Sequence, residues 1–221
     1  KIPANLSYEE AASIPEVFLT AYQALAWLAR LEKGERILIH AGASGVGLAA
    51  IQIAGIIGAE IFITASAAKH EICRKLGAQH TIDYKTEDFA VRIKELTDSK
   101  GVDVIIDFIA GPYFSRNLDS LARDGRLVLL ATLGGGKTTD ADIRQILTKR
   151  LTIMGSTLRS RTIDYQIKLN EDFMNFAHDK FQNGLLKPVI DRIFDWKDAA
   201  DAHRVMEANT NMGKLVLKIS D

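Results

Sequence analysis

Short runs of apolar residues alternate with stretches of helical periodicity between about residue 36 and residue 156. The apolar runs have the length of buried strands, and they are Arg36–His40, Ile61–Ala65, His80–Asp83, Val102–Phe108, Arg126–Leu130 and Thr152–Ser156. One helix-length segment separates each run from the next, which is typical of successive β-α-β units. We therefore predict an α/β fold with a doubly wound, six-stranded parallel sheet, helices on both faces and right-handed crossovers.

The helix-length segments supply the predicted crossovers. They are Gly45–Ile57, Ala67–Leu76, Asp88–Thr97, Tyr113–Leu121 and Asp140–Lys149. A glycine precedes each of the first five strands, at positions 34, 58, 77, 101 and 125. Glycine tolerates positive φ at the end of a helix, so these positions favour helix-to-strand turns.

Further elements flank this core on both sides. Ser7 and Glu10 have the spacing of a capping box, which predicts a helix start, and Pro15 interrupts that helix. A second amphipathic helix is predicted over about 17–31. After residue 160 the pattern predicts a long helix to about Asn183, a strand over 189–194, a helix over 197–208 and a last strand over 214–219.

Composition and charge exclude several classes of protein. Hydrophobic residues make up 47% and charged residues 25%, with 28 basic and 28 acidic side chains, so the formal net charge is zero. Such a chain is globular, and nothing in its charge favours nucleic acid or a membrane surface. A single cysteine, Cys73, cannot form an internal disulfide, and no long apolar segment is present. We expect a cytoplasmic protein without membrane attachment.

The segment from Ile37 to Leu48 carries the most informative motif. A buried strand runs into the turn Ala41-Gly42-Ala43-Ser44-Gly45-Val46-Gly47 and then into a helix. A helix N-terminus offers unpaired N–H groups to a phosphate, and glycines let a pyrophosphate approach the backbone. Compared with G-x-G-x-x-G, Ser44 replaces the middle glycine. In its strand-turn-helix context, the motif predicts a dinucleotide site on a Rossmann-type sheet rather than a mere packing turn.

The end of the second strand predicts which nucleotide binds. NAD sites usually carry an acid there to hold the ribose 2′-hydroxyl, but this strand ends in Ala65-Ser66 and is followed by Lys69. A hydroxyl and a cation suit a 2′-phosphate, to which Tyr84 could add a second hydroxyl. These residues favour NADPH, although Lys69 alone would fit a solvated helix position equally well.

Three other motifs are weaker. The run from Ala131 to Thr138 nearly spells a P-loop, with Asp107 as a candidate magnesium ligand, but the match is imperfect and a better phosphate turn exists. The sequence around Ser44 misses the G-x-S-x-G elbow of serine hydrolases because Val46 replaces glycine. No histidine has metal-ligand spacing, so we expect no metal, and no acid–base pair identifies a catalytic residue.

Taken together, these residues resemble the zinc-free quinone oxidoreductases, the zeta-crystallin-like branch of the medium-chain dehydrogenases/reductases. The resemblance covers nearly the whole chain and includes the segments 6–16, 19–22, 40–47, 75–78, 133–136, 157–161, 206–209 and 213–217. Leu158-Arg159-Ser160-Arg161 and the triple glycine at 134–136 are most similar to the stress-inducible NADPH quinone reductases. The implied activity is hydride transfer from NADPH to a quinone or enone.

The resemblance also implies roles for individual residues. Pyrophosphate contacts fall on Gly42, Ser44, Gly45 and Val46, and 2′-phosphate contacts on Ser66, Lys69 and Tyr84. Contacts on the nicotinamide side fall on Tyr22, Leu133, Gly134 and Leu158, with a further cofactor contact at Asn211 from the returning tail. Phe108 departs from the small residue that often follows the fourth-strand acid in the family.

Relatives in that branch also carry a GroES-like catalytic domain before the point that corresponds to Lys1. The resemblance therefore implies a helical lead-in over 1–33, an NADP-binding Rossmann domain over 34–160 and, over 161–221, a return segment whose last strand joins the catalytic domain. It implies a homodimer paired through the strand near Thr152–Ser156. The alternative is a non-catalytic NADPH-binding or RNA-binding module related to zeta-crystallin; the zero net charge weakens the RNA version.

Overall fold

Six parallel strands form the central sheet. A computed structural model describes residues 2–219, and its sheet contains β1 (Arg36–Ile39), β2 (Glu60–Ala65), β3 (His80–Asp83), β4 (Val102–Asp107), β5 (Leu121–Leu129) and β6 (Thr152–Gly155). The strand order is β3-β2-β1-β4-β5-β6, and every neighbouring pair is parallel. The predicted fold class is confirmed. The order reverses between β1 and β4, which is the switch point where ligands bind in open α/β sheets.

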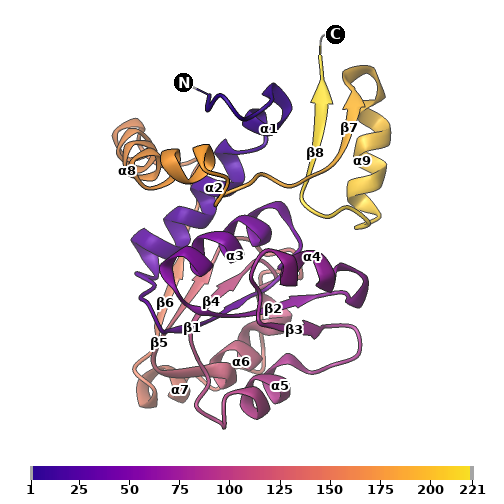
Figure 1. Cartoon of the computed structure of the whole chain (residues 1–221). Helices are drawn as coiled ribbons and strands as arrows, with labels where there is room; N and C mark the ends of the chain where they lie inside the picture. The colour runs from indigo at the N-terminus through magenta and orange to yellow at the C-terminus, as the bar shows by residue number, and fades with distance from the viewer. Residues whose placement is uncertain (1, 220–221) are drawn as a thin grey trace.

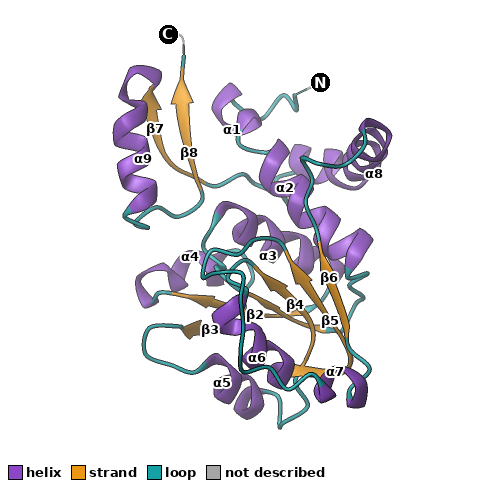
Figure 2. Cartoon of the chain, turned by 180° about the vertical axis from the view of Figure 1, so that it is seen from behind, coloured by secondary structure: helices purple, strands orange, loops and turns teal. Residues whose placement is uncertain are grey.

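Helices cover both faces of this sheet. The crossovers are α3 (Gly45–Ile57), the 3-10 turn η2 (Ala67–Lys69) with α4 (His70–Lys75), α5 (Phe89–Leu96), α6 (Gly111–Ser120) and α7 (Arg144–Thr148). α3 and α4 lie on one face, and α5, α6 and α7 lie on the other (Figures 1 and 2). The predicted bounds of α3 are confirmed, whereas α7 is shorter than predicted and begins at Arg144.

The strands alternate their side chains between two apolar cores. Ile37 and Ile39 of β1 pack in the core beneath α3, while Leu38 between them packs in the core beneath α5 and α6. On β2, Ile63 and Phe62 divide in the same way. Burial on both faces explains why these strands are continuous apolar runs in the sequence rather than alternating ones.

Most of the turn glycines adopt the left-handed conformation. Gly58, for example, ends α3 with φ of 93°. Gly125 is an exception, because it lies within β5, where the pairing with β4 is irregular, and the neighbouring residue with positive φ is Asp124, at 61°. A Cβ on Gly125 would lie 2.9 Å from the carbonyl oxygen of Ala122. Glycine therefore provides space at this irregularity of β5 rather than positive φ.

The N-terminal helices pack on the face of the sheet that α3 covers. The predicted capping box starts α1 (Tyr8–Ala12): Ser7 Oγ accepts from Glu10 N at 3.1 Å, and Ser7 N donates to the Glu10 carboxylate at 2.8 Å. Pro15 begins α2 (Pro15–Tyr22), and the chain continues as the π-helical turn η1 (Gln23–Leu28). The helix predicted over 17–31 is therefore two consecutive elements.

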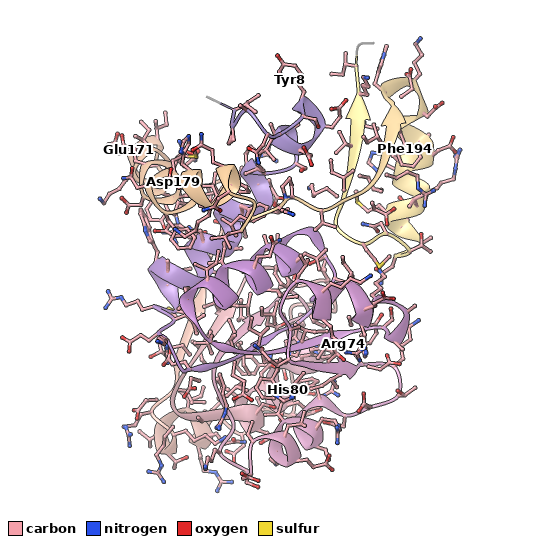
Figure 3. All side chains as sticks on the ribbon, in the orientation of Figure 1. Tyr8, Arg74, His80, Glu171, Asp179 and Phe194 are labelled. Atoms are coloured by element: carbon pink, nitrogen blue, oxygen red, sulfur yellow. The ribbon has the colours of Figure 1, made fainter. Side chains whose placement is uncertain are left out.

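The C-terminal elements lie beyond the same face. They are α8 (Ile163–Gln182), β7 (Ile190–Asp195), the 3-10 turn η3 (Trp196–Asp198), α9 (Ala199–Glu207) and β8 (Lys214–Lys218). β7 and β8 pair in parallel as a separate two-stranded sheet. Figure 3 shows the separation: Phe194 belongs to this small sheet and His80 to the main one. Within residues 2–219, no helix has the length and apolar character needed to cross a membrane.

Candidate functional site

The glycine-rich turn lies at the carboxyl end of β1, where two of its glycines are required for close packing. A Cβ on Gly47 would lie 2.4 Å from the carbonyl oxygen of Ala41, and one on Gly42 would lie 2.7 Å from Cβ of Ile63. Ser44 is the N-cap of α3, and its Oγ accepts from Gly47 N at 3.1 Å. The turn is therefore held tightly against β2, and the N-terminus of α3 opens at the switch point.

The space beside Gly45 differs from the sequence expectation. An added Cβ would meet side-chain atoms of Val17 and Lys214, each at 2.9 Å. The tail before β8 crosses the turn here, because Gly213 N donates to Ala43 O at 3.1 Å. The missing side chain of Gly45 thus admits α2 and the returning tail to the turn.

A groove of about 610 Å³ opens beside this turn. It is lined by the ends of β1 and β2, by the loops after β4 and β5, and by the tail before β8. We call it the switch-point groove. Seven of the predicted site residues line it, and they are Ser44, Gly45, Ser66, Lys69, Tyr84, Leu133 and Asn211.

The other predicted site residues lie outside the lining. Gly42 and Val46 belong to the turn but pack inward, and Gly134 follows Leu133 directly. Tyr22 packs between α2 and α8 against Phe173, with ring centroids 5.6 Å apart. Leu158 lies in the loop after β6.

Lys69 joins the two sides of the switch-point groove. Its ammonium donates to the carbonyl oxygen of Asn209 at 2.8 Å, to Asn209 Oδ1 at 3.1 Å and to the carbonyl oxygen of Asn211 at 2.9 Å. Burial lowers the pKa of Lys69, and the charge of Asp191 opposes that effect. Sequence reasoning placed Lys69 at the end of β2 but did not indicate that the tail occupies its donors.

The opposite end of the groove is formed by the loop after β4 and the loop after β5, which are joined by backbone hydrogen bonds. Leu133 N donates to Phe108 O and Gly134 N donates to Ile109 O, each at 2.9 Å. A Cβ on Gly134 would lie 2.7 Å from Cγ2 of Ile109. The loop after β5 therefore follows the loop after β4. The P-loop alternative finds no support, because α7 begins only at Arg144 and Asp107 is buried against the backbone.

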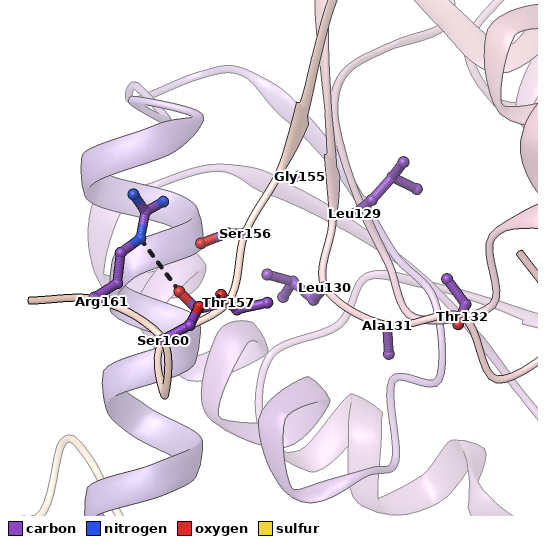
Figure 4. Close-up of a pocket in the computed structure, with 9 residues that line it drawn as sticks. All are labelled: Leu129, Leu130, Ala131, Thr132, Gly155, Ser156, Thr157, Ser160 and Arg161. Carbon is purple, nitrogen blue, oxygen red and sulfur yellow. Dashed lines mark hydrogen bonds between the residues drawn. The ribbon is translucent and has the colours of Figure 1, made fainter.

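A second hollow of about 610 Å³ lies at the carboxyl ends of β5 and β6 (Figure 4). Ser156 is 8% exposed, and its hydroxyl has no hydrogen-bond partner among the described residues. Arg161 Nε donates to Thr157 O at 3.3 Å, and its guanidinium lies 4.7 Å from the ring centre of Tyr165. This hollow borders the loop that holds Leu158.

A buried polar chain under the groove was missed by the sequence reasoning. His40 Nδ1 lies 3.0 Å from Thr64 Oγ1, His40 Nε2 lies 2.8 Å from Asn117 Oδ1, and Asn117 Nδ2 donates to Asp107 Oδ2 at 2.8 Å. Asp107 Oδ1 accepts from Ile109 N at 2.6 Å. The available signal was the position of His40 and Asp107, each a polar residue at the carboxyl end of a buried strand.

A zinc site does not fit the described residues. Within residues 2–219, no group of three or more His, Cys, Asp or Glu side chains is placed to hold a metal ion. Cys73 is buried, and burial raises the pKa of its thiol to about 11, so it is not a ready thiolate ligand.

Comparison with known proteins places the chain in a family. The profile of the family described as zinc-binding dehydrogenase matches residues 45–174. A phenolphthiocerol/phthiocerol polyketide synthase of Mycobacterium tuberculosis is 35% identical over 225 residues, covering 99% of this chain and 10% of that protein. The chain thus spans about a tenth of this curated relative.

Solved structures give the same placement. An NAD-dependent alcohol dehydrogenase matches with a TM-score of 0.86 at 32% identity, covering 99% of this chain and 61% of its own. CurK enoyl reductase matches with a TM-score of 0.84 at 35% identity, covering 99% and 64%. Mycobacterial Rv1454c complexed with NADPH matches with a TM-score of 0.85 at 28% identity, covering 99% and 67%. The chain therefore belongs to the zinc-binding dehydrogenase family of medium-chain dehydrogenases/reductases and contains the Rossmann-type nucleotide-binding domain of that family.

Proposed function

We propose that the chain binds NADPH in the switch-point groove and serves as the cofactor-binding part of a reductase. The observation that carries this proposal is the adenosine end of the groove: Ser66, Lys69 and Tyr84 converge there, and no acid ends β2. Ser66 Oγ makes no capping bond to η2, so its hydroxyl is available to a ligand at this end. A 2′-phosphate carries only acceptors and negative charge, which these groups complement.

The proposed reaction is hydride transfer from the nicotinamide to a quinone or enone. The cofactor supplies the hydride chemistry when it is bound, and the protein contributes orientation and exclusion of water. The likeness to an enoyl reductase supports an acceptor with a carbon–carbon double bond conjugated to a carbonyl. Leu133, which is 77% exposed, would contact the nicotinamide end together with Gly134 and Leu158.

Cofactor binding is tested by calorimetric titration of the chain with NADPH, NADH and 2′,5′-ADP. We expect NADPH to bind more tightly than NADH, and 2′,5′-ADP to compete with NADPH. Tighter binding of NADH would show that Ser66 and Lys69 do not meet a phosphate. Failure of both dinucleotides to bind would refute the proposed function.

We also propose that two chains pair through β6. This strand is at the edge of the sheet, where unpaired backbone groups invite pairing with another strand. Ser156 N donates to Leu129 O on β5, so the N–H groups of Ile153 and Gly155 point away from β5 by the two-residue alternation of a strand. The free edge can therefore take a partner strand without disturbing the sheet.

A further inference from the structure

The polar network from Thr64 to Asp107 lies under the groove, and Thr64 at one end of it also lines the groove beside Ala65 and Ser66. His40, Asp107 and Asn117 are each 0% exposed and Thr64 is 1% exposed. These four residues come from the end of β1, from β2, from the end of β4 and from α6, so the hydrogen-bonded network spans the switch point. The rings of Phe89 and Tyr113 enclose the imidazole, with centroids 4.7 and 4.8 Å away.

The donor and the acceptor of each hydrogen bond in this network are fixed by the carboxylate at its end. A carboxylate accepts only, so Asn117 presents its NH₂ group to Asp107 and its oxygen to His40. His40 must then carry its proton on Nε2, and its bare Nδ1 accepts from the Thr64 hydroxyl. Burial lowers the pKa of His40, with the nearby Asp107 charge opposing, which agrees with a neutral ring.

The Asp107 carboxylate, at the end of this hydrogen-bonded network, binds a backbone segment in a rarely adopted conformation. Asp107 accepts from Ile109 N at 2.6 Å and from Ala110 N at 3.2 Å. Ala110 has φ of 65° and ψ of −114°, a conformation that side-chain-bearing residues rarely adopt and that persists only where the surroundings impose it. Next to it, Gly111 N donates to Gly135 O at 2.8 Å. The loop after β4 thus fixes the loop that carries Leu133 and Gly134.

We propose that Asp107 is a positioning residue for the nicotinamide end of the groove, and that Asn117 and His40 act through it. The inference rests on the proposed function. It adds that a buried network fixes the distance between the adenosine end and the nicotinamide end of the switch-point groove. Thr64 directly precedes Ala65 and Ser66 at the adenosine end of the groove. Asp107 accepts a hydrogen bond from Ile109 N, and the carbonyl oxygen of Ile109 accepts one from Gly134 N at the other end. The buried chain therefore fixes one end of the groove relative to the other.

The first test measures which nitrogen of His40 carries the proton, and it needs no cofactor. In Asp107→Asn the new amide would donate to Asn117, which must then turn its own amide and donate to His40 Nε2. His40 would carry its proton on Nδ1 and donate to Thr64 Oγ1. Nitrogen NMR shifts of the imidazole distinguish the two tautomers: we expect Nε2–H in the wild-type chain and Nδ1–H in Asp107→Asn. An unchanged tautomer would overturn the proposed chain of hydrogen bonds.

The second test separates positioning from simple stability. We compare affinities for NADPH and for 2′,5′-ADP, which lacks the nicotinamide half, in Asp107→Ala, Asn117→Leu and Asp107→Asn. We expect the first two variants to lose tenfold or more in NADPH affinity and less than threefold in 2′,5′-ADP affinity. Asp107→Asn should stay within threefold for both, because its amide oxygen still accepts from Ile109 N and Ala110 N.

A matched control is Thr97→Val at the end of α5. Thr97 is 2% exposed, and its hydroxyl donates to Ile93 O and accepts from Gly101 N. This variant loses buried hydrogen bonds far from the groove, so it should lower the melting temperature without changing the ratio of the two affinities. An unchanged ratio in Asp107→Ala and Asn117→Leu would overturn positioning while the proposed function stands. If the wild-type chain binds neither ligand, the proposed function fails and the inference fails with it.

Discussion

Replacing Lys69 by alanine tests the assignment of the 2′-phosphate contact. In the structure, the three donors of the Lys69 ammonium group are matched by three oxygens of Asn209 and Asn211. A bound 2′-phosphate would have to take at least one of these donors from the tail. The contribution of Lys69 to the free energy of NADPH binding is therefore the difference between two bonds of its ammonium group: one to the charged phosphate and one to an uncharged oxygen of the tail.

The magnitude follows from that exchange. Both bonds use the charged ammonium group, and hydrogen bonds that involve a charged group contribute about 1.5 to 3 kcal/mol, with the contact between two opposite charges at the upper end of that range. The net loss in Lys69→Ala should then be about 0.5 to 1.5 kcal/mol, or roughly 2- to 13-fold in NADPH affinity. NADH lacks the phosphate, so we expect its affinity to change less than about twofold by the same conversion.

The assay is calorimetric titration of both cofactors at one fixed ionic strength, because salt screens this contact. Lys75→Ala is the matched control, since Lys75 lies further along α4 and pairs with Glu71 at 2.6 Å. It should leave both affinities unchanged. Equal losses for NADPH and NADH in Lys69→Ala would refute the phosphate contact and show that Lys69 acts through the tail.

Three further predictions concern the turn, the sheet edge and turnover. Gly47→Ala should lower the free energy of unfolding by about 1 to 3 kcal/mol, because its Cβ would meet backbone oxygens. Gly55→Ala, whose Cβ has only a 3.9 Å contact, should raise it by about 0.4 to 1 kcal/mol in the same thermal denaturation; equal stability of the two variants would contradict the packing argument. Gly155→Pro should give monomers in light scattering where wild type and Gly155→Ala give dimers, and a dimeric proline variant would exclude this edge. NADPH oxidation with a simple quinone should be slower for this chain than for one extended upstream by a family catalytic domain, because orienting the acceptor can supply about 7 to 11 kcal/mol of a barrier; equal turnover would show that these residues form the whole site.

Much of the candidate site could be predicted because its residues lie at the ends of strands. The glycine-rich turn after β1 and the absence of an acid after β2 are visible in the sequence, and parallel strands bring their carboxyl ends to one edge. Six of the seven predicted residues that line the switch-point groove follow strands of the main sheet for this reason, whereas Asn211 belongs to the tail before β8. Tyr22 and Leu158 came from family resemblance alone, and the structure places both outside that lining.

The sequence by itself determined the six strands, the start of α3 and the capping box at Ser7, because each depends on periodicity or on residues within one helical turn. Only the tertiary structure showed that Lys69 binds the tail at Asn209 and Asn211, or that His40 reaches Asp107 through Asn117. These partners are far apart in the chain, and a polar side chain carries no local signal of the distant partner that it meets. Their pairing is set by the packing of the helices against the sheet, where burial requires each donor to find an acceptor.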